Sequence, residues 1–179
     1  GCAELPAQVE RPVSKAFATP ETTELGALAQ STRRTAGAAD VSGYLLLAGA
    51  QVAYAARLAL VRSAQKTLDL QYYAIHADAS SGQLLRAVQE AAGAGVKVRI
   101  LLNHFHSTGP NAGVMRLAFE PNIEMRMFNP LAGSRSSFAA RMLNAVDDAA
   151  QLQQRMHNKL FIADNAMGVT GRRNLGDAY

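Results

Sequence analysis

A short pattern near the C-terminal end of the chain holds side chains that can act together on a phosphodiester. His157, Lys159 and Asp164 follow the spacing H-x-K-x4-D, and Gly171 and Asn174 come after them. Side chains two positions apart on a β-strand share a face. We therefore expect His157 and Lys159 to point together into one site.

The residue types suit attack on an anionic phosphodiester. Imidazole is uncharged and basic near neutral pH, so His157 is the candidate nucleophile or leaving-group acid. The Lys159 ammonium can bind a non-bridging phosphate oxygen, and Asn174 can add an amide donor. Gly171 lets the backbone come close to the phosphate. Asp164, beyond the strand end, is expected either to orient the imidazole or to anchor the turn.

The elements that must position these residues alternate between strands and helices. An apolar run over residues 160–163 predicts a buried strand, and a turn leads to a returning strand over 166–170. Hydrophobic periodicity predicts helices over residues 51–66, 80–94 and 108–119, and strands over 67–73, 96–102 and 122–128. This order predicts an α/β fold with a mixed, largely parallel sheet and helices on both faces. A further helix is expected over residues 138–152.

The pattern resembles the HKD signature of the phospholipase D superfamily, H-x-K-x4-D-x6-G-S-x-N. The segments MHNKLFIADN, PNIEMRMFNP and LDLQYYAIHADASSGQLLRAVQEAAGAGVKVRILL are similar to bacterial cardiolipin synthases. So is GRRNLGDAY, for which that branch commonly has GGRNIGDEYF. The resemblance covers roughly residues 43–179, one lobe of what is usually a two-lobed enzyme.

The resemblance also implies roles for the residues. A phosphohistidine would form on His157 without a metal or another cofactor, and Lys159, Gly171 and Asn174 would hold the substrate phosphate. Arg172 stands where the family has Gly or Ser, and it either adds to phosphate binding or blocks the pocket.

In this family a second HKD histidine protonates the leaving alcohol, whereas this sequence contains one motif. The second lobe is expected from the missing C-terminal half of a longer protein, or from a homodimer partner about a two-fold axis. The flanking segments favour a phosphodiesterase or phosphatidyltransferase that acts on phospholipid at a membrane surface. Two alternatives stay open: a metal-independent endonuclease working as a homodimer, and a catalytically inactive phosphate- or lipid-binding lobe.

The length and composition are typical of one globular domain with a sizeable hydrophobic core. It has 179 residues, of which 49% are hydrophobic and 18% are charged. The formal net charge of +4 suits anionic partners such as phospholipid surfaces or nucleic acid, and it also fits ordinary surface variation. No internal repeat or Gly-rich nucleotide-binding loop is visible.

The N-terminal region, residues 1–42, is expected to be a tether with one short helix around residues 23–31, or else an arm packed on the domain of residues 43–179. Gly1-Cys2 matches the end of a bacterial lipobox, which predicts a lipid on Cys2 and a place in the cell envelope. An arbitrary boundary is the other explanation of these two residues.

A second polar cluster, Asn103-His104-Phe105-His106, is expected at the carboxyl end of a strand, where α/β sheets place ligands. An H-x-H pair can bind a metal, but no cysteine or carboxylate cluster accompanies it. We therefore favour a role in lining the cleft.

Overall fold

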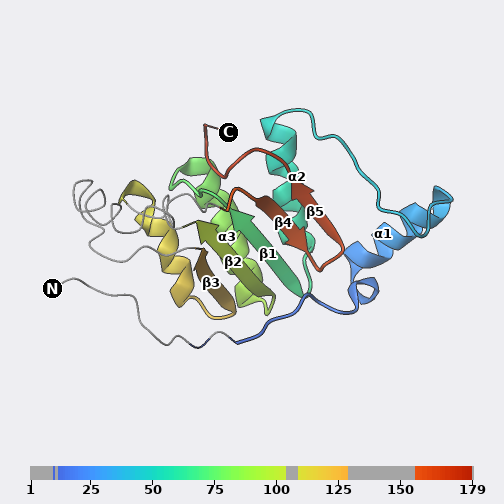
Figure 1. The fold of residues 1–179 in the computed structure, drawn as a ribbon, viewed down its shortest axis with the longest axis horizontal. Helices are drawn as coiled ribbons and strands as arrows, with labels where there is room; N and C mark the ends of the chain where they lie inside the picture. Colours follow the sequence, from blue (N-terminus) through green and yellow to red (C-terminus); the bar gives the residue numbers. More distant parts are fainter. Residues whose placement is uncertain (1–9, 11, 104–108, 129–155, 179) are drawn as a thin grey trace.

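A computed structural model of the chain describes residue 10 and residues 12–103, 109–128 and 156–178. These residues build a five-stranded sheet with the strand order β3-β2-β1-β4-β5 (Figure 1). The first three strands of the chain are parallel, whereas β4 runs antiparallel to both β1 and β5. The expected mixed sheet is confirmed. Its strands are β1 (Thr67–Tyr72), β2 (Lys97–Asn103), β3 (Ile123–Phe128), β4 (Lys159–Ala163) and β5 (Met167–Thr170).

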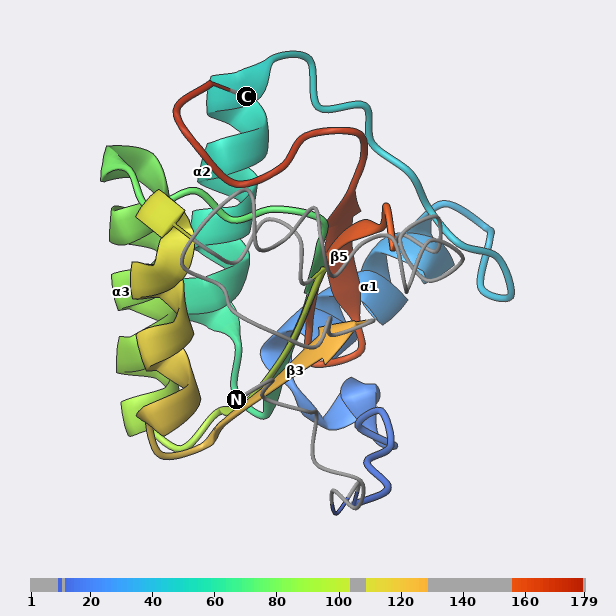
Figure 2. The same ribbon diagram turned by 60° about the vertical axis from the view of Figure 1, so that its left-hand side comes forward.

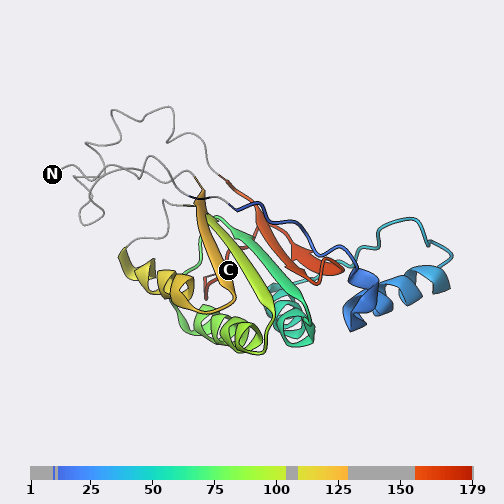
Figure 3. The same cartoon turned by 90° about the horizontal axis from the view of Figure 1, so that it is seen from below.

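Helices α2 and α3 pack side by side against one face of the sheet, next to the 3-10 helix η3 (Figures 2 and 3). Helix α1 lies beyond the β5 edge (Figure 1). Helices were expected on both faces, but α2, α3 and η3 all cover the same one. The helical elements are η1 (Pro20–Thr22), α1 (Glu24–Thr35), α2 (Ala50–Ser63), α3 (Ala79–Gly93) and η3 (Gly109–Phe119).

The core lies between the helices and the inward-facing positions of the sheet. Alternate residues of β1 and β2 are buried, as the period of a strand with one packed face requires. Leu68, Leu70 and Ile100 of the strands meet Leu84 and Val88 of α3 in this layer, and each of these side chains is at most 2% exposed. Full burial of such a side chain contributes about 1.5–3 kcal/mol.

The opposite face of the sheet carries polar side chains and is crossed by the N-terminal segment. Arg99 of β2 forms an ion pair with Asp69 of β1, and its Nη1 donates to Ser14 Oγ at 2.9 Å and to the Lys15 carbonyl at 2.7 Å. Arg126 Nη2 donates to the Pro12 carbonyl at 2.7 Å. Residues 12–17 therefore form an arm packed on the sheet, which is the second of the two expectations for this region (Figure 3). Cys2 lies outside the described residues.

The predicted boundaries of the helices shift where capping decides them. Helix α3 begins at Ala79 because the Asp78 side chain accepts a hydrogen bond from the Ser81 N–H. It ends at Gly93, and Gly95 then adopts φ +98°, a conformation that favours glycine. The helix expected over residues 138–152 lies outside the described part. None of the helices in the described part of the chain combines the length and the apolar character of a membrane span.

Candidate active site at the edge of β1 and β4

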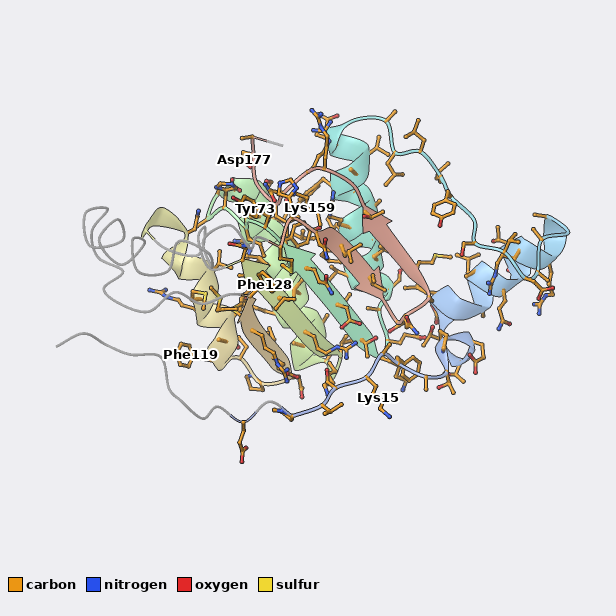
Figure 4. The ribbon with its side chains drawn as sticks, viewed as in Figure 1. Lys15, Tyr73, Phe119, Phe128, Lys159 and Asp177 are labelled. Carbon is orange, nitrogen blue, oxygen red and sulfur yellow. The ribbon has the colours of Figure 1, made fainter. Side chains whose placement is uncertain are left out.

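His157 and Lys159 lie where β4 begins, beside the end of β1. Lys159 is the register partner of Tyr72, the last residue of β1. The next residue, Tyr73, contacts His157 edge-on, with ring centroids 5.0 Å apart and an interplanar angle of 63°. Figure 4 labels Tyr73 and Lys159 at this edge of the sheet. The predicted pairing of His157 and Lys159 at one site is the arrangement in the structure.

The Lys159 side chain is 3% exposed. Its Nζ donates to the His157 carbonyl at 2.9 Å and lies 5.4 Å from the centroid of the Tyr73 ring, which it faces. Burial lowers the pKa of Lys159 from its ordinary value. An ammonium has three donors, so this one can still donate to a phosphate oxygen. In a partly desolvated position, that interaction is stronger than in water.

His157 itself is exposed, so its imidazole can reach a substrate from solvent. Its neighbour Asn158 is also exposed, and its Nδ2 donates to Gln71 Oε1 at 3.2 Å. The site thus combines an accessible imidazole with a buried ammonium held two residues away. In chemical terms, such an imidazole can attack a phosphate group while the ammonium offsets the phosphate charge.

Asp164 lies at the other end of β4, roughly 16 Å from Lys159 by strand rise. Its carboxylate is fully buried and accepts hydrogen bonds from the backbone N–H groups of Gln65, Lys66 and Thr67. These residues connect α2 to β1. Of the two roles expected for Asp164, these contacts are those of an anchor, and the structure does not bring the carboxylate to His157.

Asn174 comes to the same edge as His157 through a short pairing of the C-terminal segment with the end of β1. Its side chain is 9% exposed, and Oδ1 accepts from the Ala74 N–H at 3.2 Å. The next residue, Leu175, forms a parallel bridge with Ile75. A Cβ at Gly176 would lie 2.9 Å from Asp78 Oδ2, so a larger residue here would have to displace neighbouring side chains.

Gly171 and Arg172 follow β5 and are both exposed. Both roles expected for Arg172, phosphate binding and blocking of the site, therefore stay predictions. Asn103 is buried at the end of β2, while His104 and His106 lie outside the described residues. Within the described ranges, no group of three or more His, Cys, Asp or Glu side chains is placed to hold a metal ion.

Tyr73 is the site residue that sequence reasoning missed. The strand predicted over residues 67–73 includes Tyr73, but the sequence pattern gave this side chain no role. The available signal was its position directly after a parallel strand, at the sheet edge where α/β folds place their ligands.

Comparisons with known proteins identify the family of this chain. A family model described as "Cardiolipin synthase, PLD-like domain" matches residues 58–178. The chain therefore belongs to the phospholipase D superfamily. Its relatives place it in the cardiolipin synthase-like branch. Cardiolipin synthase C of Escherichia coli (strain K12) is 41% identical over 127 residues, covering 71% of this chain and 26% of the relative. Cardiolipin synthase 2 of Staphylococcus epidermidis (strain ATCC 12228) is 27% identical over 119 residues, covering 66% of this chain and 22% of the relative. The chain thus spans about a quarter of the length of these relatives.

The solved structures that are similar to the chain include NucT and Nuc. NucT from Helicobacter pylori has a TM-score of 0.48 and 16% identity, covering 70% of this chain and 69% of that one. Nuc from Salmonella typhimurium, described as a phospholipase D family member, has a TM-score of 0.48 and 23% identity, covering 69% of this chain and 65% of that one.

Proposed function

We propose that this chain is one lobe of a cardiolipin synthase-like phosphatidyltransferase or phospholipase, in which His157 forms a phosphohistidine. The observation that carries the proposal is the exposed His157 imidazole beside the buried Lys159 ammonium. The 41% identity to a cardiolipin synthase supports phospholipid as the substrate class.

In the proposed reaction, a ring nitrogen of His157 attacks phosphorus and the bond to the leaving alcohol breaks. The alkoxide takes a proton from the histidine of a second HKD motif. An acceptor alcohol, or water, then attacks phosphorus and breaks the P–N bond, while the second histidine takes the proton from the attacking hydroxyl group. Lys159 donates to a non-bridging oxygen throughout. Asn174 Oδ1 is occupied by the Ala74 N–H, so its amide nitrogen is the group that serves the phosphate.

The second motif is proposed to come from the remainder of a longer protein or from a second copy of this chain. The quarter of the relatives' length that this chain spans favours the longer protein. A metal-independent endonuclease working as a homodimer uses the same residues, so the substrate must be decided by experiment. A third outcome is a lobe that binds phosphate without turnover.

We further propose that the lobe works at a membrane surface. Tyr44, Leu45 and Leu46 are adjacent in sequence and 93%, 84% and 90% exposed. Consecutive apolar side chains on the surface of a positively charged chain suit the boundary of an anionic bilayer.

The testing experiment traps the intermediate on the full-length protein. Phosphatidylglycerol vesicles are added in the presence of a chelator, the reaction is quenched, and the intact mass is measured. We expect a phosphatidyl adduct that is absent in His157→Gln and retained in Asn158→Ala, the exposed neighbour on the other face of the strand. An adduct that persists in His157→Gln would refute the role of His157. Nicking of DNA in the presence of a chelator, with no lipid adduct, would support the endonuclease alternative instead.

A further inference from the structure

A pocket of about 300 Å³ is lined by residues of α2, the start of α3 and the C-terminal segment. Figure 2 shows the C-terminal segment passing over the N-terminal end of α2. We infer that this pocket binds a second phosphate of the substrate, next to the phosphate that His157 attacks. The inference rests on the proposed function only for the statement that the ligand belongs to the substrate.

The main feature of the pocket is a buried guanidinium. Arg57 of α2 lines the pocket and is 5% exposed. Its Nε donates to the Tyr72 hydroxyl at 3.0 Å and its Nη1 to the Ala53 carbonyl at 2.9 Å. Both acceptors are neutral. The Ala53 carbonyl carries no charge, and burial raises the pKa of Tyr72, which keeps its hydroxyl protonated. The ion pairs formed within the described residues belong to other arginines. A buried cation without a counter-ion is costly, and an anionic ligand would compensate it.

A buried hydroxyl points to the same ligand. Ser81 lines the pocket and is 2% exposed, and its Oγ has no hydrogen-bond partner within the described part of the chain. A buried hydroxyl without a partner is unfavourable, and a phosphate oxygen would supply the missing acceptor. The helix terminus itself is already capped. The Ser81 N–H donates to Asp78 at 3.1 Å, and the Ser80 N–H donates to Asp177 at 3.0 Å.

The charge of the lining is positive. The exposed Arg173 contributes a second guanidinium, and Asp177 is the acidic residue of the lining. The hydrogen bonds from Ser80 lower the pKa of Asp177, so this carboxylate stays ionised and remains engaged with α3. Two guanidinium groups against one carboxylate favour an anion in the space between them.

The pocket adjoins the candidate active site through Asn174. This side chain lines the pocket, and its Oδ1 accepts from the N–H of Ala74, the residue after Tyr73. Tyr73 in turn contacts His157. A substrate with two phosphates on a flexible backbone can therefore place one at His157 and the other at Arg57. A lipid with two phosphate groups and a nucleic acid strand share this chemistry.

The first experiment isolates the pocket from the catalytic site. Inorganic phosphate is titrated calorimetrically into His157→Ala/Lys159→Gln protein at constant ionic strength. We expect binding to persist in this background and to weaken about tenfold when Arg173→Gln removes one charged donor. Arg86→Gln is the matched control, because Arg86 is exposed on α3 and is not part of the lining. Loss of all phosphate binding in the double variant, or equal binding by Arg173→Gln, would overturn the inference.

A second variant keeps the test independent of folding. Ser81→Ala removes a hydroxyl that has no hydrogen-bond partner among the described residues. The variant without phosphate should therefore unfold at the same temperature as wild type or higher, while phosphate should stabilise it less than it stabilises wild type. If phosphate stabilises Ser81→Ala and wild type equally, the hydroxyl is not part of the site.

Kinetics then identify the source of the second phosphate. In the otherwise wild-type protein, Arg173→Gln should raise KM about tenfold for a substrate with two phosphates and leave bis(p-nitrophenyl) phosphate, which has one, unchanged. An effect on cardiolipin identifies a lipid, and an effect on an oligonucleotide identifies a nucleic acid. An effect on neither would overturn the inference and leave the proposed chemistry at His157 untouched.

Discussion

Asp164→Asn tests whether the aspartate of the HKD motif is an anchor or a catalytic group. The carboxylate is fully buried against the connection between α2 and β1. Its Oδ1 accepts from the N–H groups of Lys66 at 2.7 Å and Thr67 at 2.9 Å, and its Oδ2 accepts from the Gln65 N–H at 2.9 Å. Those bonds hold the start of β1, whose other end carries Tyr73 beside His157.

The expected cost follows from these contacts. An asparagine keeps one acceptor oxygen, loses the charge, and turns an NH₂ group towards the Gln65 N–H. A hydrogen bond to a charged group contributes about 1.5–3 kcal/mol, so the free energy of unfolding should fall by about 2–3 kcal/mol. Asp164→Ala leaves the three backbone donors without an acceptor and should cost about 4 kcal/mol.

Urea denaturation followed by circular dichroism measures the free energy of unfolding, and turnover is measured on the folded fraction. We expect Asp164→Asn to be destabilised while the folded protein keeps most of its activity. Asp69→Asn is the control, because Asp69 forms an ion pair with Arg99 on the partly exposed face, where such pairs contribute about 0–1 kcal/mol. If Asp164→Asn has wild-type stability but loses turnover about hundredfold or more, the carboxylate acts on the imidazole and our reasoning is wrong.

Three further substitutions address the site. Because burial lowers the pKa of Lys159, the unfolded chain keeps this proton to higher pH than the folded chain, and stability rises with pH towards the ordinary value of 10.5. The unfolding free energy of wild type minus that of Lys159→Met should therefore increase between pH 7 and 10.5. A difference that stays constant would contradict the burial of a charged Lys159. Tyr73→Leu removes the ring that contacts His157 and Lys159, so it should lower kcat about tenfold. Tyr73→Phe keeps the ring and should keep most of kcat. An equal loss of kcat in both variants would assign the effect to the hydroxyl. Gly176→Ala places a Cβ 2.9 Å from Asp78 Oδ2 and 3.0 Å from His76 Cδ2. It should lower the free energy of unfolding, measured by thermal or urea denaturation, by about 1–3 kcal/mol. Gly93→Ala is the control, because its Cβ would lie in open space and should not destabilise the protein.

The order of elements was predictable because it depends on local periodicity. Alternating burial in β1 and β2 and the apolar stripe of α3 are short-range patterns, and the structure has them where the sequence places them. The spacing of His157 and Lys159 follows from the same two-residue period. Periodicity could not predict that the N-terminal segment covers the outer face of the sheet. The contacts of Arg99 with Ser14 and Lys15 join residues about 85 positions apart, beyond the range of a local pattern.

The role of Asp164 was open for the same reason. Its partners lie 97 to 99 residues earlier in the chain, and nothing in the local sequence distinguishes an imidazole from a set of backbone N–H groups. Arg57 is a similar case. An arginine on a helix is expected to be exposed to solvent. Arg57 is buried because α2 packs against Tyr72 and the C-terminal segment.

The contacts of Asp164 and Asn174 give these two motif residues a structural role. Asp164 binds the backbone at the start of β1, and Asn174 binds the backbone just past its end, across 97 and 100 residues of sequence. Between these two contacts, β4 pairs with β1 from Leu68 to Tyr72. The strand is thus held at both ends, and this fixes Tyr73 relative to His157 and Lys159. Asp164 and Asn174 therefore hold β1 in place, and His157 and Lys159, which we propose to contact the substrate, lie where β1 ends and β4 begins.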